Sequence, residues 1–378
     1  MNILFITPGI VQPLNGGIER TTLALSQALY DFYGHVSSFR SLEDNYTEDQ
    51  WASYIEERKI DIIIAQGADK RIAQLLPLLR RIINNINHKI VLLFAFHSNP
   101  GVELISMDYA ALFNRLVHGV DVKANLQQLA WQIGKPIMYR GMMSHLRDKY
   151  RLPYNYADKV ILLSKNYIPE YRAISGGEED RFLAIPNMFP FPEDTKPAES
   201  KTKTILIVSR MEERQKRIKL AIKIWHSIAH KGWNLKIVGA GEELDYYKCL
   251  ANKWHVKDIS FEGRQNSIPY YQEAQIFMMT SSCEGLPMTI LEAQQCGCVP
   301  IVFDTFASLP DVVTDGSNGF VVAEGDEEQY MSRLTQLMND EALRKQMAKK
   351  GYSDSRRFAP SKVAAQWDKL FNELINQG

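Results

Sequence analysis

The sequence predicts an α/β fold built from two Rossmann-like, doubly wound domains. Three observations lead to this prediction. Short apolar runs rich in β-branched residues alternate with longer amphipathic stretches along the whole chain. The apolar runs show little polar alternation, which is typical of parallel strands covered by helices on both faces. The chain of 378 residues is also long enough for two domains of about 150–200 residues each.

The apolar runs are the predicted strands, with helices between them. In the first half of the chain we expect strands at residues 2–7, 61–65, 89–96 and 159–163. In the second half we expect strands at 204–209, 235–238, 259–262, 276–280 and 299–303. Apolar residues at helical spacing predict helices over 218–229 and 330–338.

One segment interrupts this alternation. Residues 186–203 hold four prolines, several charges and no periodicity, which indicates a linker. We therefore predict an N-terminal domain at 1–186, a linker at 187–203 and a C-terminal domain at 204–356. The final segment, 357–378, has apolar residues at helical spacing and is predicted to be a core-packing helix. Two such domains facing each other would enclose a cleft at the carboxyl ends of their strands.

Composition narrows the classes of function. The 44 basic and 44 acidic residues cancel, so the charge favours no nucleic-acid partner. The amino terminus lacks the pattern of a secretion signal, and no run approaches the roughly 20 apolar residues of a membrane span, so we expect a cytoplasmic protein. The cysteines are read as buried, reduced thiols rather than as disulfides or a metal site: Cys249, Cys283, Cys296 and Cys298. We expect no metal and no cofactor.

The strongest motif covers residues 281–304, SSCEGLPMTILEAQQCGCVPIVFD. Pro287 suits the first position of a helix, and Gly297 suits the left-handed residue that ends one. A short helix is therefore predicted between them. The free amides of Met288 and Thr289 at its amino terminus would form a cradle for a diphosphate.

Two glutamates accompany this helix start. Glu284 lies in the loop and Glu292 inside the helix. Either one alone is better explained as an ordinary acidic surface residue, but the whole string, with its glycines, Pro287 and flanking strands, is not. Their spacing and the EGLPM…LEAQQCG…P context resemble the signature of retaining glycosyltransferases of family four, which have the GT-B fold. The resemblance implies that Glu284 sits by the transferred sugar and that Glu292 hydrogen-bonds the nucleotide ribose. It also implies that amides around Gly285 and Leu286 hold sugar hydroxyls. Pro287 departs from the glycine of many relatives and removes one amide donor.

A second motif, residues 207–225, supplies positive charge. Arg210 follows a predicted strand, and Lys216 precedes an amphipathic helix. Two cations there would stabilise the charge that develops on a departing diphosphate, in place of a metal. The family's Arg and Lys pair maps onto these two residues. Arg214 and Arg217 are close enough to be alternatives for this pair, but a basic, solvated helix start explains them and Lys219 better than it explains Arg210.

Two further signals lie in the first half. Gly16 and Gly17 follow the first strand, where they form either a structural turn or the family's loop facing the donor phosphates, with Glu19 touching substrate. His97 ends the strand VLLFAF, and it is either structural or, as the resemblance implies, close to the transferred sugar.

Other segments carry weaker signals. Gly263 and Arg264 end a predicted strand, and by resemblance their backbone contacts the nucleotide base. The resemblance also implies that the terminal helix at 357–378 returns towards the first domain. Residues 137–151 are basic and amphipathic, which leaves two interpretations open: a helix packed on its own domain, or a peripheral contact with the inner face of the membrane.

Together with the resemblance, these residues imply a metal-independent, retaining glycosyltransferase that moves a hexose or N-acetylhexosamine. The resemblance implies a nucleoside diphosphate sugar as donor, UDP-linked, and a glycan or lipid-linked acceptor, as in cell-surface polysaccharide synthesis. Two alternatives remain open: a sugar-nucleotide epimerase of similar fold and a non-catalytic sugar-nucleotide-binding protein.

Overall fold

The computed structural model describes residues 1–11, 17–104, 146–189 and 191–377, together with Leu126, Leu129, Ala130 and Ile133. The described residues form two compact units. The first comprises those within Met1–Val102, Met138–Pro190 and Arg357–Gly378. The second comprises those within Glu103–Ile137 and Phe191–Arg356.

The first unit is built on a parallel six-stranded sheet with the order β2-β1-β3-β4-β5-β6. Its strands are β1 (Asn2–Thr7), β2 (Val36–Ser41), β3 (Ile62–Gln66), β4 (Val91–Phe96), β5 (Lys159–Leu162) and β6 (Phe182–Ala184). Every residue of β3 and β4 is buried, which explains why both strands are continuous apolar runs in the sequence.

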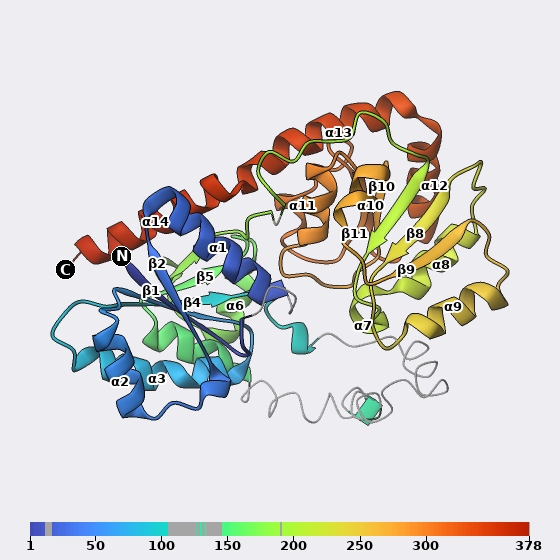
Figure 1. The fold of residues 1–378 in the computed structure, drawn as a ribbon. Helices are drawn as coiled ribbons and strands as arrows, with labels where there is room; N and C mark the ends of the chain where they lie inside the picture. The colour runs from blue at the N-terminus through green and yellow to red at the C-terminus, as the bar shows by residue number, and fades with distance from the viewer. Residues whose placement is uncertain are drawn as a thin grey trace. The chain divides into compact units, whose positions relative to one another are not determined.

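Helices cover this sheet (Figure 1): α1 (Gly17–Tyr33), α2 (Glu48–Glu57), α3 (Lys70–Asn84), α6 (Tyr167–Ser175) and α14 (Pro360–Asn376). Local caps begin two of them, since Thr47 and Gln50 form a capping box for α2 and Asp69 caps α3. The last helix, α14, packs beside α1 although more than 300 residues separate them. Its Trp367 and Phe371 join Ile3 of β1 in one apolar core.

The second unit repeats the architecture with the order β12-β11-β10-β7-β8-β9, again all parallel. Its strands are β7 (Thr204–Val208), β8 (Asn234–Val238), β9 (Ile259–Gly263), β10 (Ile276–Met279), β11 (Val299–Asp304) and β12 (Phe320–Ala323). Its helices are α7 (Glu213–Lys216), α8 (Ile218–His226), α9 (Leu244–Lys253), α10 (Ile268–Glu273), α11 (Met288–Gln295), α12 (Glu327–Asn339) and α13 (Glu341–Ser355).

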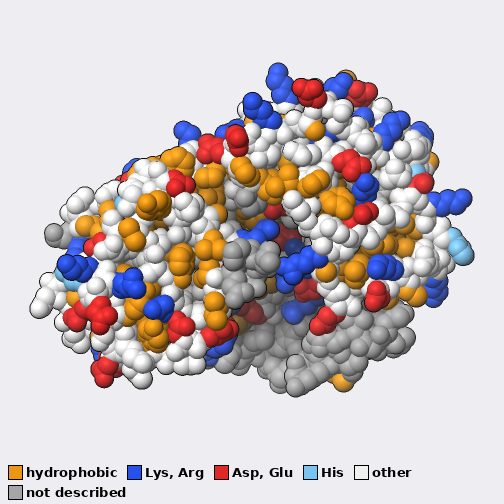
Figure 2. All heavy atoms as spheres, in the orientation of Figure 1, with side chains coloured by type: hydrophobic (Ala, Val, Ile, Leu, Met, Phe, Trp, Pro, Cys, Tyr) orange, Lys and Arg blue, Asp and Glu red, His pale blue; other side chains and the backbone are white. Residues whose placement is uncertain are grey.

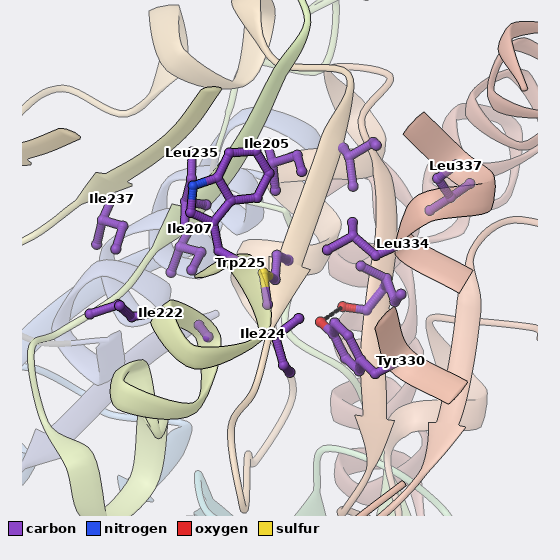
Figure 3. Packing of buried hydrophobic residues seen from close by; sticks show 14 of the residues in the cluster. Ile205, Ile207, Ile222, Ile224, Trp225, Leu235, Ile237, Tyr330, Leu334 and Leu337 are labelled. Atoms are coloured by element: carbon purple, nitrogen blue, oxygen red, sulfur yellow. Dashed lines mark hydrogen bonds between the residues drawn. The ribbon is translucent and has the colours of Figure 1, made fainter. Parts of the chain in front are cut away.

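The core of the second unit lies between this sheet and α8 and α12. Figure 3 shows Trp225 and Tyr330 packed among isoleucine and leucine side chains from both helices and from β7 and β8. The one polar atom of Tyr330 is satisfied there, because its hydroxyl lies 2.8 Å from the backbone oxygen of Ile301. This core therefore fixes the positions of β7, β8 and β10 and of the loops that follow them.

The predicted fold class, two Rossmann-like parallel-sheet α/β units, is confirmed. Each predicted strand has a counterpart within two residues of its predicted ends. The strands that the sequence did not predict are β2, β6 and β12, and all three lie at sheet edges. An edge strand is covered less completely than a central one, so its sequence need not be a continuous apolar run. In β2, for example, VSSFRS is largely polar.

The surface carries charges of both signs. Figure 2 shows acidic and basic side chains interspersed over the visible face of each unit, in agreement with the neutral total. In the part of the chain that the structure describes, no helix combines the length and apolar character needed to cross a bilayer.

Candidate active site

Three loops of the second unit meet at the carboxyl ends of neighbouring strands. They follow β7, β8 and β10. Strands β7 and β10 are adjacent in the sheet, although β8 follows β7 along the chain, so the strand order reverses between them. In open α/β sheets this reversal is where ligands bind.

An ion pair joins two of these loops. The Nζ atom of Lys216, at the end of α7, lies 2.6 Å from Oε1 of Glu284 in the loop after β10. The side chains are only 16% and 11% exposed, respectively, so water screens the pair less than it would at the surface. The structure thus brings together a predicted phosphate-binding cation and a predicted sugar-binding carboxylate. Lys216 and Thr289 also line one small cavity at the strand ends.

Gln215 links the second predicted cation to the same group. Its Oε1 accepts a hydrogen bond from Arg210 at 3.1 Å, and its Nε2 donates to Glu284 Oε2 at 3.4 Å. Nε2 also donates to the backbone oxygen of Cys283 at 2.9 Å. Gln215 was not among the residues predicted from the sequence. Its place between Arg210 and Lys216 was the available signal, but only the fold shows that it reaches Glu284.

Arg217 has a structural role that the sequence analysis did not anticipate. It adopts a left-handed conformation between α7 and α8. Its guanidinium donates to the backbone oxygens of Thr280 at 2.7 Å and Ser281 at 3.1 Å. The expectation of a merely solvated helix start was therefore wrong for Arg217, because its side chain fastens the loop after β10 to α7.

The helix of the strongest motif, α11, begins one residue later than predicted. Pro287 is its N-cap rather than its first helical residue, with φ −75° and ψ 86°. Met288 and Thr289 form the first turn, and Leu286 before them is buried. Gly285 lies in the loop beside Glu284. At the other end Gly297 has φ +72°, as expected of the left-handed residue that follows a helix.

Glu292 lies deeper than its partner carboxylate. It is 2% exposed, and Oε2 accepts a hydrogen bond of 2.7 Å from the hydroxyl of Tyr271. Burial raises the pKa of Tyr271, with the charge of Glu292 adding to the effect. The structure therefore places Glu292 within the unit, held by α10, while Glu284 stands at the loop.

Gly263 and Arg264 lie at the end of β9, the strand next to β8. Gly263 has φ +70°, and its oxygen accepts a hydrogen bond of 2.7 Å from the amide of Gly239 after β8. Arg264 is exposed. These two residues thus belong to the row of strand ends that also carries Arg210.

The remaining predicted residues belong to the first unit. His97 follows β4, and its Nε2 lies 2.9 Å from Oε1 of Gln66 at the end of β3. Burial lowers the pKa of His97 to about 4, so the ring is neutral at pH 7. Its Nδ1 has no hydrogen-bond partner among the described residues. Gly17 begins α1, with Glu19 in its first turn. Gly16 lies outside the described residues.

The basic segment at 137–151 is described only from residue 146 onward. There Lys149 is buried, 5.6 Å from the ring of Phe96 and 5.4 Å from that of Tyr150, whereas Arg147 and Arg151 are exposed. This part of the segment packs on its own unit through Lys149.

All four cysteines are free thiols, and Cys283, Cys296 and Cys298 are buried as expected. The expectation of burial was wrong for Cys249, which lies on the exposed face of α9. No disulfide joins them, and burial raises the pKa of Cys296 to about 12. Among the described residues no group of three or more His, Cys, Asp or Glu side chains is placed to hold a metal ion.

Comparison with known proteins finds relatives for the part of the chain that holds this site. Residues 191–354 match the family "Glycosyl transferases group 1". The amylovoran biosynthesis glycosyltransferase AmsD of Erwinia amylovora is 27% identical over 230 residues, which are 58% of this chain and 63% of AmsD. An uncharacterized glycosyltransferase of Haemophilus influenzae is 30% identical over 192 residues, 50% of this chain and 54% of that protein. The matched part thus spans less than two thirds of these relatives.

Similarity of structure extends further than similarity of sequence. The crystal structure of Anabaena Alr3699/HepE in complex with UDP superposes with a TM-score of 0.73 over 99% of this chain and 100% of that one, at 16% identity. Sucrose-phosphate synthase from Thermosynechococcus elongatus gives a TM-score of 0.73 over both whole chains, at 15% identity. The fold is therefore that of the GT-B glycosyltransferases. Residues 191–354, which hold Arg210, Lys216, Glu284 and Glu292 and make up less than half of the chain, are similar to the group 1 glycosyl transferases.

Proposed function

We propose that the protein is a retaining glycosyltransferase that uses a nucleoside diphosphate sugar. The observation that carries the proposal is the joining of Lys216, Gln215 and Arg210 to Glu284 where the strand order reverses. A transferable sugar with a diphosphate leaving group needs both kinds of charge at one place. The cations meet the phosphates, and the carboxylate meets the sugar hydroxyls.

In the proposed reaction the bond between the anomeric carbon and a diphosphate oxygen breaks, and an acceptor oxygen bonds to that carbon. Arg210 and Lys216 stabilise the negative charge that the leaving diphosphate gains. Amides of Met288 and Thr289 add their partial positive charge at the start of α11. Glu284 and the amides of Gly285 and Leu286 orient the sugar.

The remaining predicted residues have supporting roles in this proposal. Glu292 binds the ribose, and Gly263 and Arg264 contact the base. The first unit supplies the acceptor side, with Gly16 and Gly17 near the phosphates. His97 contributes a neutral imidazole to the sugar, consistent with its low pKa. The division 1–186, 187–203, 204–356 and 357–378 is part of the same proposal.

The finer assignments are a UDP-linked hexose or N-acetylhexosamine as donor and a glycan or lipid-linked acceptor. The complex of HepE with UDP supports the base, and the polysaccharide named for AmsD supports the class of product. With such an acceptor we propose that the enzyme works at the cytoplasmic face of the membrane.

The test is release of nucleoside diphosphate from a panel of UDP-, GDP- and ADP-linked sugars, each with glycan and lipid-linked acceptors. We expect release from one class of donor, a product that keeps the anomeric configuration, and loss of release in Glu284→Gln. The variant Glu327→Gln is the control. Glu327, on α12, also forms an ion pair with a lysine, Lys223 of α8, but this pair is not part of the candidate site. Undiminished release by Glu284→Gln would remove Glu284 from the mechanism.

The same panel separates the two alternatives. An epimerase would convert the donor sugar with no acceptor present, and product analysis would reveal it. A binding protein would take up the sugar nucleotide with no turnover on any acceptor. Either result would replace the proposal.

A further inference from the structure

Two buried glutamates beside the proposed site share a single tyrosine hydroxyl. Glu213 is the first residue of α7, and Glu243 precedes α9; they are 8% and 2% exposed. The hydroxyl of Tyr247 lies 2.9 Å from Oε2 of Glu213 and 2.9 Å from Oε2 of Glu243. None of the three residues has a part in the proposed transfer.

If both glutamates were ionised, the three groups would have one proton too few for these two hydrogen bonds. A tyrosine hydroxyl has one hydrogen, so it can donate to only one of the two carboxylates. The other oxygen then faces a lone pair of the tyrosine oxygen, unless that carboxyl group is itself protonated and donates. Two buried like charges in such contact are also costly. One shared proton therefore satisfies all three groups.

The surroundings favour the proton on Glu213. Burial, with the nearby charge of Glu243, raises the pKa of Glu213 to about 7. Three contacts oppose this shift in pKa without cancelling it: the backbone amide of Lys219 on α8, which donates to Oε2 of Glu213 at 2.9 Å, the hydroxyl of Tyr247, and the charge of Lys219. Tyr246 also lies near both glutamates, and burial, followed by the charges of Glu213 and Glu243, raises its pKa.

These contacts decide where α7 lies. The backbone amide of Glu213, at the start of α7, donates to Oε2 of Glu243, so a side chain from the loop after β8 caps this helix. The other end of α7 is held by the loop after β10, where the Thr280 hydroxyl donates to the Lys216 oxygen at 2.9 Å. Contacts with two different loops thus fix both ends of this four-residue helix, of which Lys216 is the last residue.

We propose that Glu213 and Glu243 share one proton and form a positioning pair that holds α7, and with it Lys216, in place for the donor diphosphate. Ionisation of both glutamates sets two like charges against each other at the start of α7 and loosens the helix. Lys216 is then less well positioned, and the affinity for the diphosphate falls. The role of Lys216 in binding a diphosphate rests on the proposed function. The shared proton does not, because it follows from the contacts of Tyr247 alone.

The first test measures the proton itself in the protein without nucleotide. Infrared difference spectra between pH 5.5 and 8.5 should show the band of a protonated carboxyl group that disappears with a midpoint near pH 7. The band should be absent in Glu213→Gln, whose amide is neutral at every pH. It should persist in Glu242→Gln, a change in the exposed glutamate beside Glu243. Absence of a titrating band that depends on Glu213 would overturn the inference.

The second test measures positioning by calorimetric titration with UDP. The ratio of the dissociation constants of the wild type and Glu213→Gln cancels the titration of the nucleotide itself. If binding raises the pKa of the pair from about 7 by one unit, this ratio should increase about sevenfold between pH 6 and 8.5. Glu242→Gln should follow the wild type. A ratio that stays constant over this range would overturn the positioning role.

A failure of the proposed function is distinguishable from a failure of this inference. If no nucleotide binds, the proposed function fails, whereas the infrared titration is unaffected. Positioning is then tested by hydrogen exchange at residues 213–217 without ligand. Exchange in the wild type should exceed that in Glu213→Gln by a factor that increases with pH. An unchanging factor would contradict the role of the pair.

Discussion

The candidate site depends on a small number of polar contacts between residues far apart in the chain. Lys216 and Glu284 are 68 residues apart, and Gln215 holds both Arg210 and Glu284. Each partner restricts the rotamers of the other, so the charges are placed before a donor arrives. Such preorganisation is what makes charged groups effective in catalysis.

Loss of either charge should slow transfer without unfolding the protein. For Lys216→Ala and for Glu284→Gln we expect kcat to fall by about 10²–10³, as when one donor to a developing charge is removed. Steady-state kinetics with the donor identified by the panel measures this effect. Lys223→Ala is the matched control, since Lys223 forms an exposed pair with Glu327. Equal losses in Lys216→Ala and Lys223→Ala would contradict a specific role for Lys216.

His97 should make stability depend on pH. Its folded pKa of about 4 lies below the ordinary value of 6.5, so the unfolded chain binds a proton more readily between these values. The contribution of neutral His97 is therefore complete above about pH 6.5 and is lost as the pH falls towards 4. Urea unfolding at pH 7.5 and 5 should show a larger loss of free energy in the wild type than in His97→Gln. The exposed His226→Gln should behave as the wild type.

At the scale of elements, the loops after β7 and β8 approach too closely for any side chain at Gly239. A Cβ atom there would lie 1.8 Å from the backbone oxygen of Ser209, the residue before Arg210. The backbones of Gly239 and Ser209 therefore lie very close together, and the amide of Ser209 donates to the backbone oxygen of Val238 at 3.0 Å. This approach holds the beginning of the Arg210 loop against the end of β8. The role of the glycine is thus steric as well as conformational, since its φ is +142°.

Gly239→Ala should therefore displace Arg210. We expect weaker UDP binding, by about tenfold or more, and a loss of about 1–3 kcal/mol in the free energy of unfolding from overpacking. Gly232→Ala separates strain from the clash, because Gly232 has φ +79° but a Cβ atom added there would meet no described residue beyond its chain neighbours within 4 Å. It should cost about 1–2 kcal/mol and leave UDP binding unchanged. Equal effects on binding would refute the steric explanation.

The terminal helix α14 stabilises the first unit through one face. Trp367 is 5% exposed, and its ring centroid lies 5.9 Å from that of Phe371. Trp367→Ala should lower the free energy of unfolding by about 3–5 kcal/mol, as for large buried aromatic residues. Gln366→Ala, on the exposed face of the same helix, should change it by no more than about 0.5 kcal/mol. Urea denaturation of both variants is the measurement.

Which elements could be predicted depended on their place in the sheets. Central strands such as β3 and β4 are covered on both faces, so their apolar runs are visible in the sequence. Among the edge strands, β2 is largely polar, whereas β6 and β12 are apolar but only three and four residues long, so none of the three stands out in the sequence. The short helix α7 was not predicted either, since its placement depends on Glu243 and on the loop after β10 rather than on its own four residues.

At the scale of the whole molecule, the proposed nucleotide site belongs to the second unit, so ligand binding should be detected there. UDP at 100 times its dissociation constant should stabilise the folded protein by about 2.7 kcal/mol. Hydrogen exchange should slow at residues 209–217 and 280–289. Lys216→Ala should reduce both effects at the same UDP concentration. Protection confined to the first unit would contradict the assignment of the nucleotide site.

The sequence by itself determined the fold class, the central strands and the motif around Glu284, because apolar runs, prolines and glycines act on the chain nearby. Only the tertiary structure decided that Gln215 joins Arg210 to Glu284, that Glu292 is buried against Tyr271, and that Glu213 meets Glu243. These contacts join residues 5 to 69 positions apart, and those between different loops form only because parallel strands bring their carboxyl ends to one edge. A local pattern carries no information about such a partner.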